Sequence, residues 1–134
     1  QDVSMGRGIR SNDGHDKTSG PSIGDLNQDG YMDIVQCDHA RNPVRVFYGS
    51  ASGQFRPTLT FVSRGDRHGT AIGDIDGNNK LDIVLAVGGA QGIRPSNPRV
   101  ELTVRNGSLV PGQDLLGRPL RGVAVRLFDI DKDG

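Results

Sequence analysis

The chain has 134 residues, and its 16 basic and 16 acidic side chains give a formal net charge of zero at pH 7. A chain of this length suits one ordinary domain. Its balanced charge gives no reason to expect a nucleic acid as partner. No run of 18 apolar residues occurs, so the sequence predicts no membrane-spanning helix and no membrane insertion. The 20 glycines, 7 prolines and 34% hydrophobic residues favour short strands joined by many turns.

Residues 1–19 are rich in turn-forming residues and poor in apolar ones, as in Met5-Gly6-Arg7-Gly8 and Ser11-Asn12-Asp13-Gly14. We interpret this segment as an N-terminal arm or loop. Further along, Cys37 falls within an apolar strand pattern. Because it is the single cysteine, an intramolecular disulfide is excluded, and a buried inert thiol is expected.

An acidic loop of nine residues follows at 25–33, with side-chain oxygens at loop positions 1, 3, 5 and 9. Ca²⁺ needs roughly six to eight oxygen ligands, and a carbonyl at position 7 commonly supplies one of them. Gly30 at position 6 allows the sharp turn that such a loop requires. The predicted ligands are Asp25, Asn27, Asp29 and Asp33, with the backbone carbonyl of Tyr31.

A second loop at 74–82 repeats the pattern, with Asn79 at position 6, the next best residue for a left-handed conformation. Its predicted ligands are Asp74, Asp76, Asn78 and Asp82, with the carbonyl of Lys80. One such loop could be an acidic turn without a metal, but two with matching oxygens favour Ca²⁺ sites. An EF-hand needs Glu at position 12 and then a helix. Here Gln36 and Leu85 stand at position 12 within β-branched, apolar runs, which predict strands at 33–37 and 82–87.

The repeat continues beyond the loops. Alternating runs at 44–48 and 100–104 predict half-buried strands, and Ser52-Gly53 and Asn106-Gly107 predict hairpin turns. Fourth strands are expected at 57–62 and 108–111. A third loop opens at Asp129, and the first residues of the three loops are 49 and then 55 residues apart.

Four strands per period of this length are typical of a β-propeller blade. We therefore predict an all-β chain of four-stranded antiparallel blades: blade 1 at 20–68, blade 2 at 69–120 and the start of blade 3 at 121–134. Because each repeat needs neighbours to bury its faces, the remaining blades are expected from the same polypeptide or from an assembly partner.

The run Ile23-Gly24-Asp25-Leu26-Asn27-Gln28-Asp29-Gly30-Tyr31-Met32-Asp33-Ile34-Val35 resembles the FG-GAP/VCBS repeat of integrin alpha heads, cartilage acidic proteins and secreted bacterial propellers. The resemblance implies a propeller, commonly seven-bladed, with Ca²⁺ between the first and second strands of a blade and an extracellular location. Asn79 departs from the pattern, in which Gly is usual. The ligand roles carry over to both loops above and, in the incomplete third loop, to Asp129, Asp131 and Asp133.

The family resemblance does not give an activity, because propellers host many functions. We expect a non-catalytic extracellular binding or adhesion module with Ca²⁺ as a structural ion. The alternative is the propeller domain of a secreted carbohydrate-active enzyme of the polysaccharide lyase kind, or a lectin, although the chain has no Trp for stacking on sugars. No histidine or tyrosine stands in a spacing that links it to a second catalytic group, so no catalytic residue is predicted. The side chains considered are His15, His39, His68, Tyr31 and Tyr48.

In a four-stranded blade, the connections between strands two and three, and between blades, emerge opposite the metal loops. These segments, 38–43, 63–68, 88–98 and 113–121, hold six Arg and three Asp, a sum of +3. We expect this face to meet an anionic glycan or an extracellular protein through Arg64, Arg67 and Arg94. Arg64-Gly65-Asp66 is also the tripeptide that many integrins recognise, although three common residues in a polar connection match it by chance.

Overall fold

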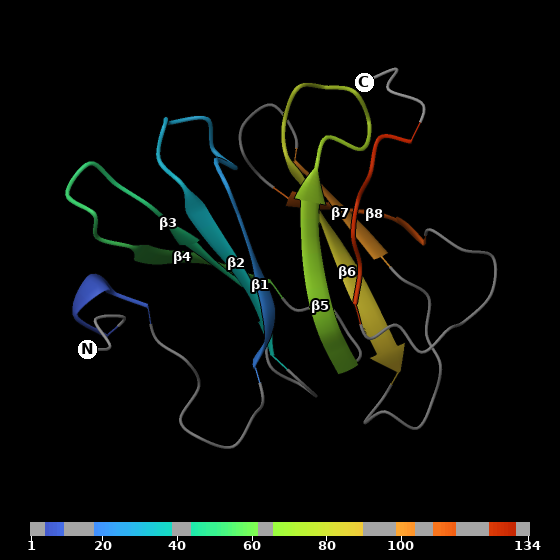
Figure 1. Cartoon of the computed structure of the whole chain (residues 1–134), viewed down its shortest axis with the longest axis horizontal. Helices are drawn as coiled ribbons and strands as arrows, with labels where there is room; N and C mark the ends of the chain where they lie inside the picture. The colour runs from blue at the N-terminus through green and yellow to red at the C-terminus, as the bar shows by residue number, and fades with distance from the viewer. Residues whose placement is uncertain are drawn as a thin grey trace.

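The computed structural model of the chain describes residues 5–9, 18–38, 44–61, 66–89, 99–103, 109–114 and 124–130 (Figure 1). Apart from a 3-10 turn at Met5–Arg7, the elements in these ranges are strands in two four-stranded antiparallel sheets. The predicted all-β class is therefore confirmed. No helix among the described residues has the length and apolar character needed to cross a membrane.

Each sheet follows the chain order, every strand pairing antiparallel with the next. The first sheet contains β1 (Thr18–Gly24), β2 (Asp33–Asp38), β3 (Val44–Tyr48) and β4 (Arg56–Phe61). The second contains β5 (Asp66–Gly73), β6 (Asp82–Gly89), β7 (Arg99–Thr103) and β8 (Leu109–Asp114). This meander is the topology expected of a propeller blade, and the loops 25–33 and 74–82 join the first two strands of each sheet.

Two strands begin earlier than predicted. β1 starts at Thr18, inside the expected arm, and β5 starts at Asp66, inside the expected connection 63–68. Both gain length because pairing continues past an irregularity. In β1, Ser19 pairs with Cys37 and Ser22 with Val35, so Gly20 and Pro21 face a single residue of β2. This bulge accommodates a proline, which has no backbone N–H to donate to a regular ladder.

The predicted connections 38–43, 88–98 and 113–121 begin later than expected. The strands that precede them, β2, β6 and β8, extend to Asp38, Gly89 and Asp114. The first strand predicted for a third blade is not formed within residues 124–130, which pair with no strand among the described residues. This segment instead runs beside β5 (Figure 1). A strand requires a hydrogen-bonded neighbour, and the described part of the chain supplies none at this position.

The two sheets pack against each other and share one core. β5 contacts both β1 and β2. The buried cluster combines side chains of β2, β3, β6 and the first loop: Leu26, Val35, Cys37, Val44, Val46, Ile83 and Leu85. Cys37 is buried in β2, in agreement with the strand pattern. The sequence pattern thus explains which strand faces are apolar, and the packing of the sheets decides which of those faces meet.

The first strands of the two sheets also make polar contacts. The Ser22 hydroxyl donates to the carbonyl of Thr70 at 2.8 Å and lies 2.8 Å from the Thr70 hydroxyl. Thr70 in turn donates to the carbonyl of Gly20 at 3.3 Å. These contacts fix β5 against β1 near the bulge and therefore set the relative positions of the two acidic loops.

Candidate metal centres

The first acidic loop curls around its own side-chain oxygens. Asp25 accepts from the N–H of Asp29 at 3.0 Å through Oδ1 and from the N–H of Gly30 at 2.8 Å through Oδ2. Asn27 Oδ1 accepts from the N–H of Asp29 at 3.1 Å, and Asp29 Oδ1 accepts from the N–H of Tyr31 at 2.9 Å. The oxygens predicted at positions 1, 3 and 5 thus all turn toward the inside of the loop.

The second loop makes the same contacts, position for position. Asp74 accepts from the N–H of Asn78 at 3.1 Å and from the N–H of Asn79 at 2.7 Å. Asp76 Oδ1 accepts from the N–H of Asn78 at 3.2 Å, and Asn78 Oδ1 accepts from the N–H of Lys80 at 2.9 Å. Two loops with different residues at seven of their nine positions therefore adopt one geometry.

The aspartate at position 9 is the last residue of each loop. Both of these side chains, Asp33 and Asp82, are fully buried. Asp33 Oδ2 accepts from the N–H of Leu26 at 2.8 Å, and its Oδ1 accepts from the N–H of Gly49 at 2.9 Å. Asp82 Oδ2 accepts from the N–H of Ile75 at 2.9 Å. These carboxylates belong to the start of β2 and β6, so they attach each loop to the sheet.

Gly49 is a residue that the sequence pattern did not single out. A Cβ at this position would collide with the backbone carbonyl of Met32, so only glycine allows the end of β3 to approach the first loop closely enough to reach Asp33. The available signal was a glycine directly after a strand, which marks a possible close backbone approach.

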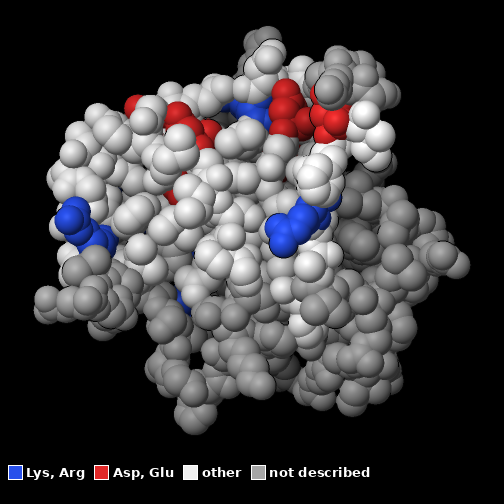
Figure 2. Space-filling view, viewed as in Figure 1, with Lys and Arg blue, Asp and Glu red and all other residues white. Residues whose placement is uncertain are grey.

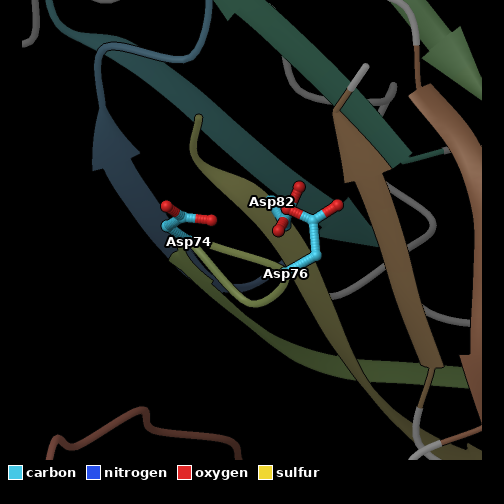
Figure 3. Close-up of side chains that lie close together, drawn as sticks. All are labelled: Asp74, Asp76 and Asp82. Carbon is cyan, nitrogen blue, oxygen red and sulfur yellow. The ribbon is translucent and has the colours of Figure 1, made fainter. Parts of the chain in front are cut away.

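Three carboxylates of the second loop lie close together. Each of Asp74, Asp76 and Asp82 offers a carboxylate oxygen, and these oxygens lie within 4.8 Å of one another (Figure 3). This group could hold a metal ion. Carboxylate oxygens are hard ligands, which suit Ca²⁺ or Mg²⁺ better than softer metals. In the first loop, the amide of Asn27 takes the place of one carboxylate and donates to Asp29 Oδ2 at 2.9 Å.

Both loops enter the left-handed backbone region at positions 4 and 6. In the first loop these positions are Gln28 (φ 59°) and Gly30 (φ 88°). In the second they are Gly77 (φ 73°) and Asn79 (φ 62°). The turn predicted at position 6 is confirmed, and the turn at position 4 was missed. Because a side chain disfavours this region, Gln28 costs about 1 kcal/mol relative to glycine.

Gln28 also links the two loops. Its Nε2 donates to the carbonyl of Asn79 at 2.6 Å, and Lys80 Nζ donates to its Oε1 at 3.2 Å. The loops lie at the same end of the sheets, and Figure 2 shows acidic side chains gathered along that upper edge. The two acidic loops therefore lie along one edge of the molecule.

Burial raises the pKa of Asp33 above its ordinary value of 3.8, and the negative charge of Asp29 adds to this effect. The hydrogen bonds from Gly49 and Leu26 oppose it. Burial, together with the charge of Asp33, also raises the pKa of Tyr48 above 10.0. A carboxyl group that resists ionisation beside other carboxylates is a place where a cation would relieve the cost of the negative charge.

Some predicted site residues are not brought into these centres. Asp129 is exposed and described, whereas Asp131 and Asp133 lie outside the described residues. Arg64 and Arg94 also lie outside them, and Arg67 is described only as a backbone residue of β5. Of the Arg-Gly-Asp tripeptide, Asp66 begins β5. The third metal site and the basic face therefore stay predictions.

A comparison with family models agrees with this geometry. Residues 25–85, from the first aspartate of the first loop to the middle of β6, match the model described as the FG-GAP-like repeat. No curated protein and no solved structure gives a significant match. The matched span contains both acidic loops, and FG-GAP repeats are generally associated with calcium. The resemblance inferred from the first loop is thus confirmed, in that residues 25–85 match the FG-GAP-like repeat.

Proposed function

We propose that the chain is a segment of an extracellular, calcium-binding β-propeller that acts as a non-catalytic binding or adhesion module. The observation that supports this most is the repeated loop geometry. Both loops direct oxygens at positions 1, 3 and 5 inward, and both end on a fully buried aspartate. Because such a carboxylate is costly to bury without a counter-ion, the arrangement favours a bound cation as a structural brace.

The chemistry of the donors favours calcium. Positions 1, 3, 5 and 9 together with the carbonyl at position 7 give five protein oxygens per loop, and Ca²⁺ accepts six to eight oxygens in flexible geometry, whereas Mg²⁺ prefers a smaller octahedron. Loops of extracellular modules bind Ca²⁺ at roughly 10⁻⁴–10⁻³ M. That range suits the outside of a cell, and it is the basis for proposing a secreted protein.

The proposed partners follow from the same picture. The loop end of the sheets would be occupied by metal ions. The opposite face, with Arg64, Arg67 and Arg94, would meet an anionic glycan or another extracellular protein. Removing these three arginines together should weaken binding to sulfated glycans in a salt-dependent manner while leaving calcium binding intact.

Thermal melting with Ca²⁺, Mg²⁺ or chelator tests the proposal. A cation that binds only the folded chain stabilises it by about 2.7 kcal/mol at 100 times Kd. For a domain of this size, we expect Ca²⁺ to raise Tm by roughly 10 °C over the chelator sample, and Mg²⁺ to raise it much less. A double variant, Asp29→Asn with Asp76→Asn, is the control, because it should lose most of the calcium shift and keep the Tm measured in chelator. Three coincident wild-type curves would show that calcium is not a structural ion.

The calcium effect should also depend on pH. Because the pKa of Asp33 is raised in the folded protein, its neutral form stabilises the metal-free fold below the unfolded pKa, and this contribution is lost as pH rises through the folded pKa. Calcium binds the ionised form and competes with the proton. The calcium-induced rise in Tm should therefore grow between about pH 4 and pH 7. The same rise at both pH values would contradict this role of Asp33.

A further inference from the structure

The two sheets meet where β1 ends in a glycine. A Cβ built on Gly24 would lie 2.5 Å from Ile72 Cδ1 and 2.8 Å from Leu81 Cδ1, so two side chains of the second sheet occupy the space that a larger residue would need. The contact recurs one repeat later, where a Cβ on Gly73 would lie 2.8 Å from Leu127 Cδ1. In each case, an apolar side chain of the following repeat lies on the glycine of the preceding one.

The repeat shows which side chains make this contact. Two residues before the first aspartate of each loop stands an apolar residue: Ile23, Ile72 or Leu127. Loop position 8 is also apolar, as Met32 in the first loop and Leu81 in the second. Ser22 contacts Thr70 of the second sheet, and Gly24 faces Ile72. Because side chains alternate along a strand, Ile23, which lies between them, points away from the second sheet.

Ile23 and Met32 are exposed by 62% and 61%, respectively. Their counterparts Ile72 and Leu81 are partly buried and pack against the core. We call the surface formed by Ile23 and Met32 the outer flank. The first sheet thus displays toward solvent the same pair of apolar side chains with which the second sheet contacts Gly24.

We propose that the outer flank is the docking surface for another blade whose first strand ends in glycine. Ile23 and Met32 would pack on that glycine in the same way that Ile72 and Leu81 pack on Gly24. The inference rests on the proposed assignment of the sheets as propeller blades. It makes the interaction directional, because each blade offers apolar side chains on one side and a glycine on the other. Successive blades therefore join head to tail.

The third repeat does not offer a matching glycine. Phe128 stands where the earlier repeats have Gly24 and Gly73, and it is 78% exposed. A phenylalanine fills the volume that the two incoming side chains would occupy. The segment 124–130 is therefore a poor acceptor for the outer flank of a second copy of the chain. The acceptor that a second copy could offer is Gly73, which Leu127 covers.

The test uncovers Gly73 in the full chain. In Leu127→Asp, and in the milder Leu127→Ala, the segment 124–130 should leave this position and the outer flank of a second copy should replace it. We expect both variants to form head-to-tail oligomers in sedimentation velocity at about 100 μM, corresponding to a Kd in the micromolar range, whereas wild type stays monomeric. Circular dichroism identifies the variants that are folded, and Leu127→Ala decides the outcome if Leu127→Asp unfolds.

The matched control adds Ile23→Asp and Met32→Asp to each variant, which should restore the monomer. Folded Leu127→Ala that remains monomeric would overturn the proposal, and so would association that persists without the outer flank. The experiment is run in Ca²⁺ and in chelator. Association without any calcium-dependent change in Tm would support the docking surface and contradict the proposal that Ca²⁺ is a structural ion. The two proposals can therefore be tested separately.

Discussion

Replacing Asp33 by alanine should lower the free energy of unfolding by about 3 kcal/mol or more, even in chelator. The side chain is fully buried, and its two oxygens accept from the N–H groups of Leu26 and Gly49. Alanine leaves both donors without an acceptor, and each buried unsatisfied group costs about 1–3 kcal/mol. Asp33→Asn should fall between alanine and wild type, because an amide has one oxygen and can satisfy only one of the two donors.

Urea denaturation in chelator measures this effect apart from any metal. Asp29→Ala is the matched control, since Asp29 belongs to the same loop but is exposed and accepts from one backbone N–H, that of Tyr31. Its loss should cost about 1 kcal/mol or less in chelator. If the two alanine variants unfold at the same urea concentration, the buried Asp33 side chain does not attach the loop to the sheet.

Leu85→Ala should destabilise the chain by about 2–5 kcal/mol, the usual cost of a cavity at a buried leucine. Leu85 is fully buried in β6 and belongs to the cluster shared with Val35 and Val46 of the first sheet. A loss of this size is a large fraction of the roughly 5–15 kcal/mol that stabilises a typical domain. The variant therefore tests whether the two sheets unfold as one cooperative unit.

Ile23→Ala is the control for Leu85→Ala. Its side chain is 62% exposed on the outer flank, so its loss should change the free energy of unfolding by about 0.5 kcal/mol or less. If Leu85→Ala unfolds in two separate steps, with one step at the wild-type midpoint, the sheets are independent and the shared core does not stabilise both.

Local pattern was enough to place much of the fold and of the candidate site. The run of β-branched residues after Asp82 predicts β6, and the alternation at 44–48 matches β3 at Val44–Tyr48. The oxygens at positions 1, 3 and 5 accept from backbone N–H groups of their own loop, because short side chains that alternate around a turn reach the backbone donors of the same turn. These features depend on contacts within a few residues.

Features that depend on the placement of one sheet against the other could not be predicted. The link from Gln28 to Lys80 joins residues 52 positions apart, and either side chain alone looks like an ordinary exposed polar residue. The contact of Ile72 with Gly24 likewise requires the angle between sheets. The bulge at Gly20 and Pro21, which lengthens β1, follows from its pairing with β2 and not from the residues of β1 alone.

The shared left-handed geometry at positions 4 and 6 bears on how such loops are found in genomes. Each loop has one glycine, which stands at position 6 in the first loop, as Gly30, and at position 4 in the second, as Gly77. A consensus that demands glycine at position 6 would score the second loop as degenerate, although its backbone follows the same path. A search profile that rewards glycine or asparagine at either position, treating the pair as a single conformational constraint, would recover both loops with equal weight.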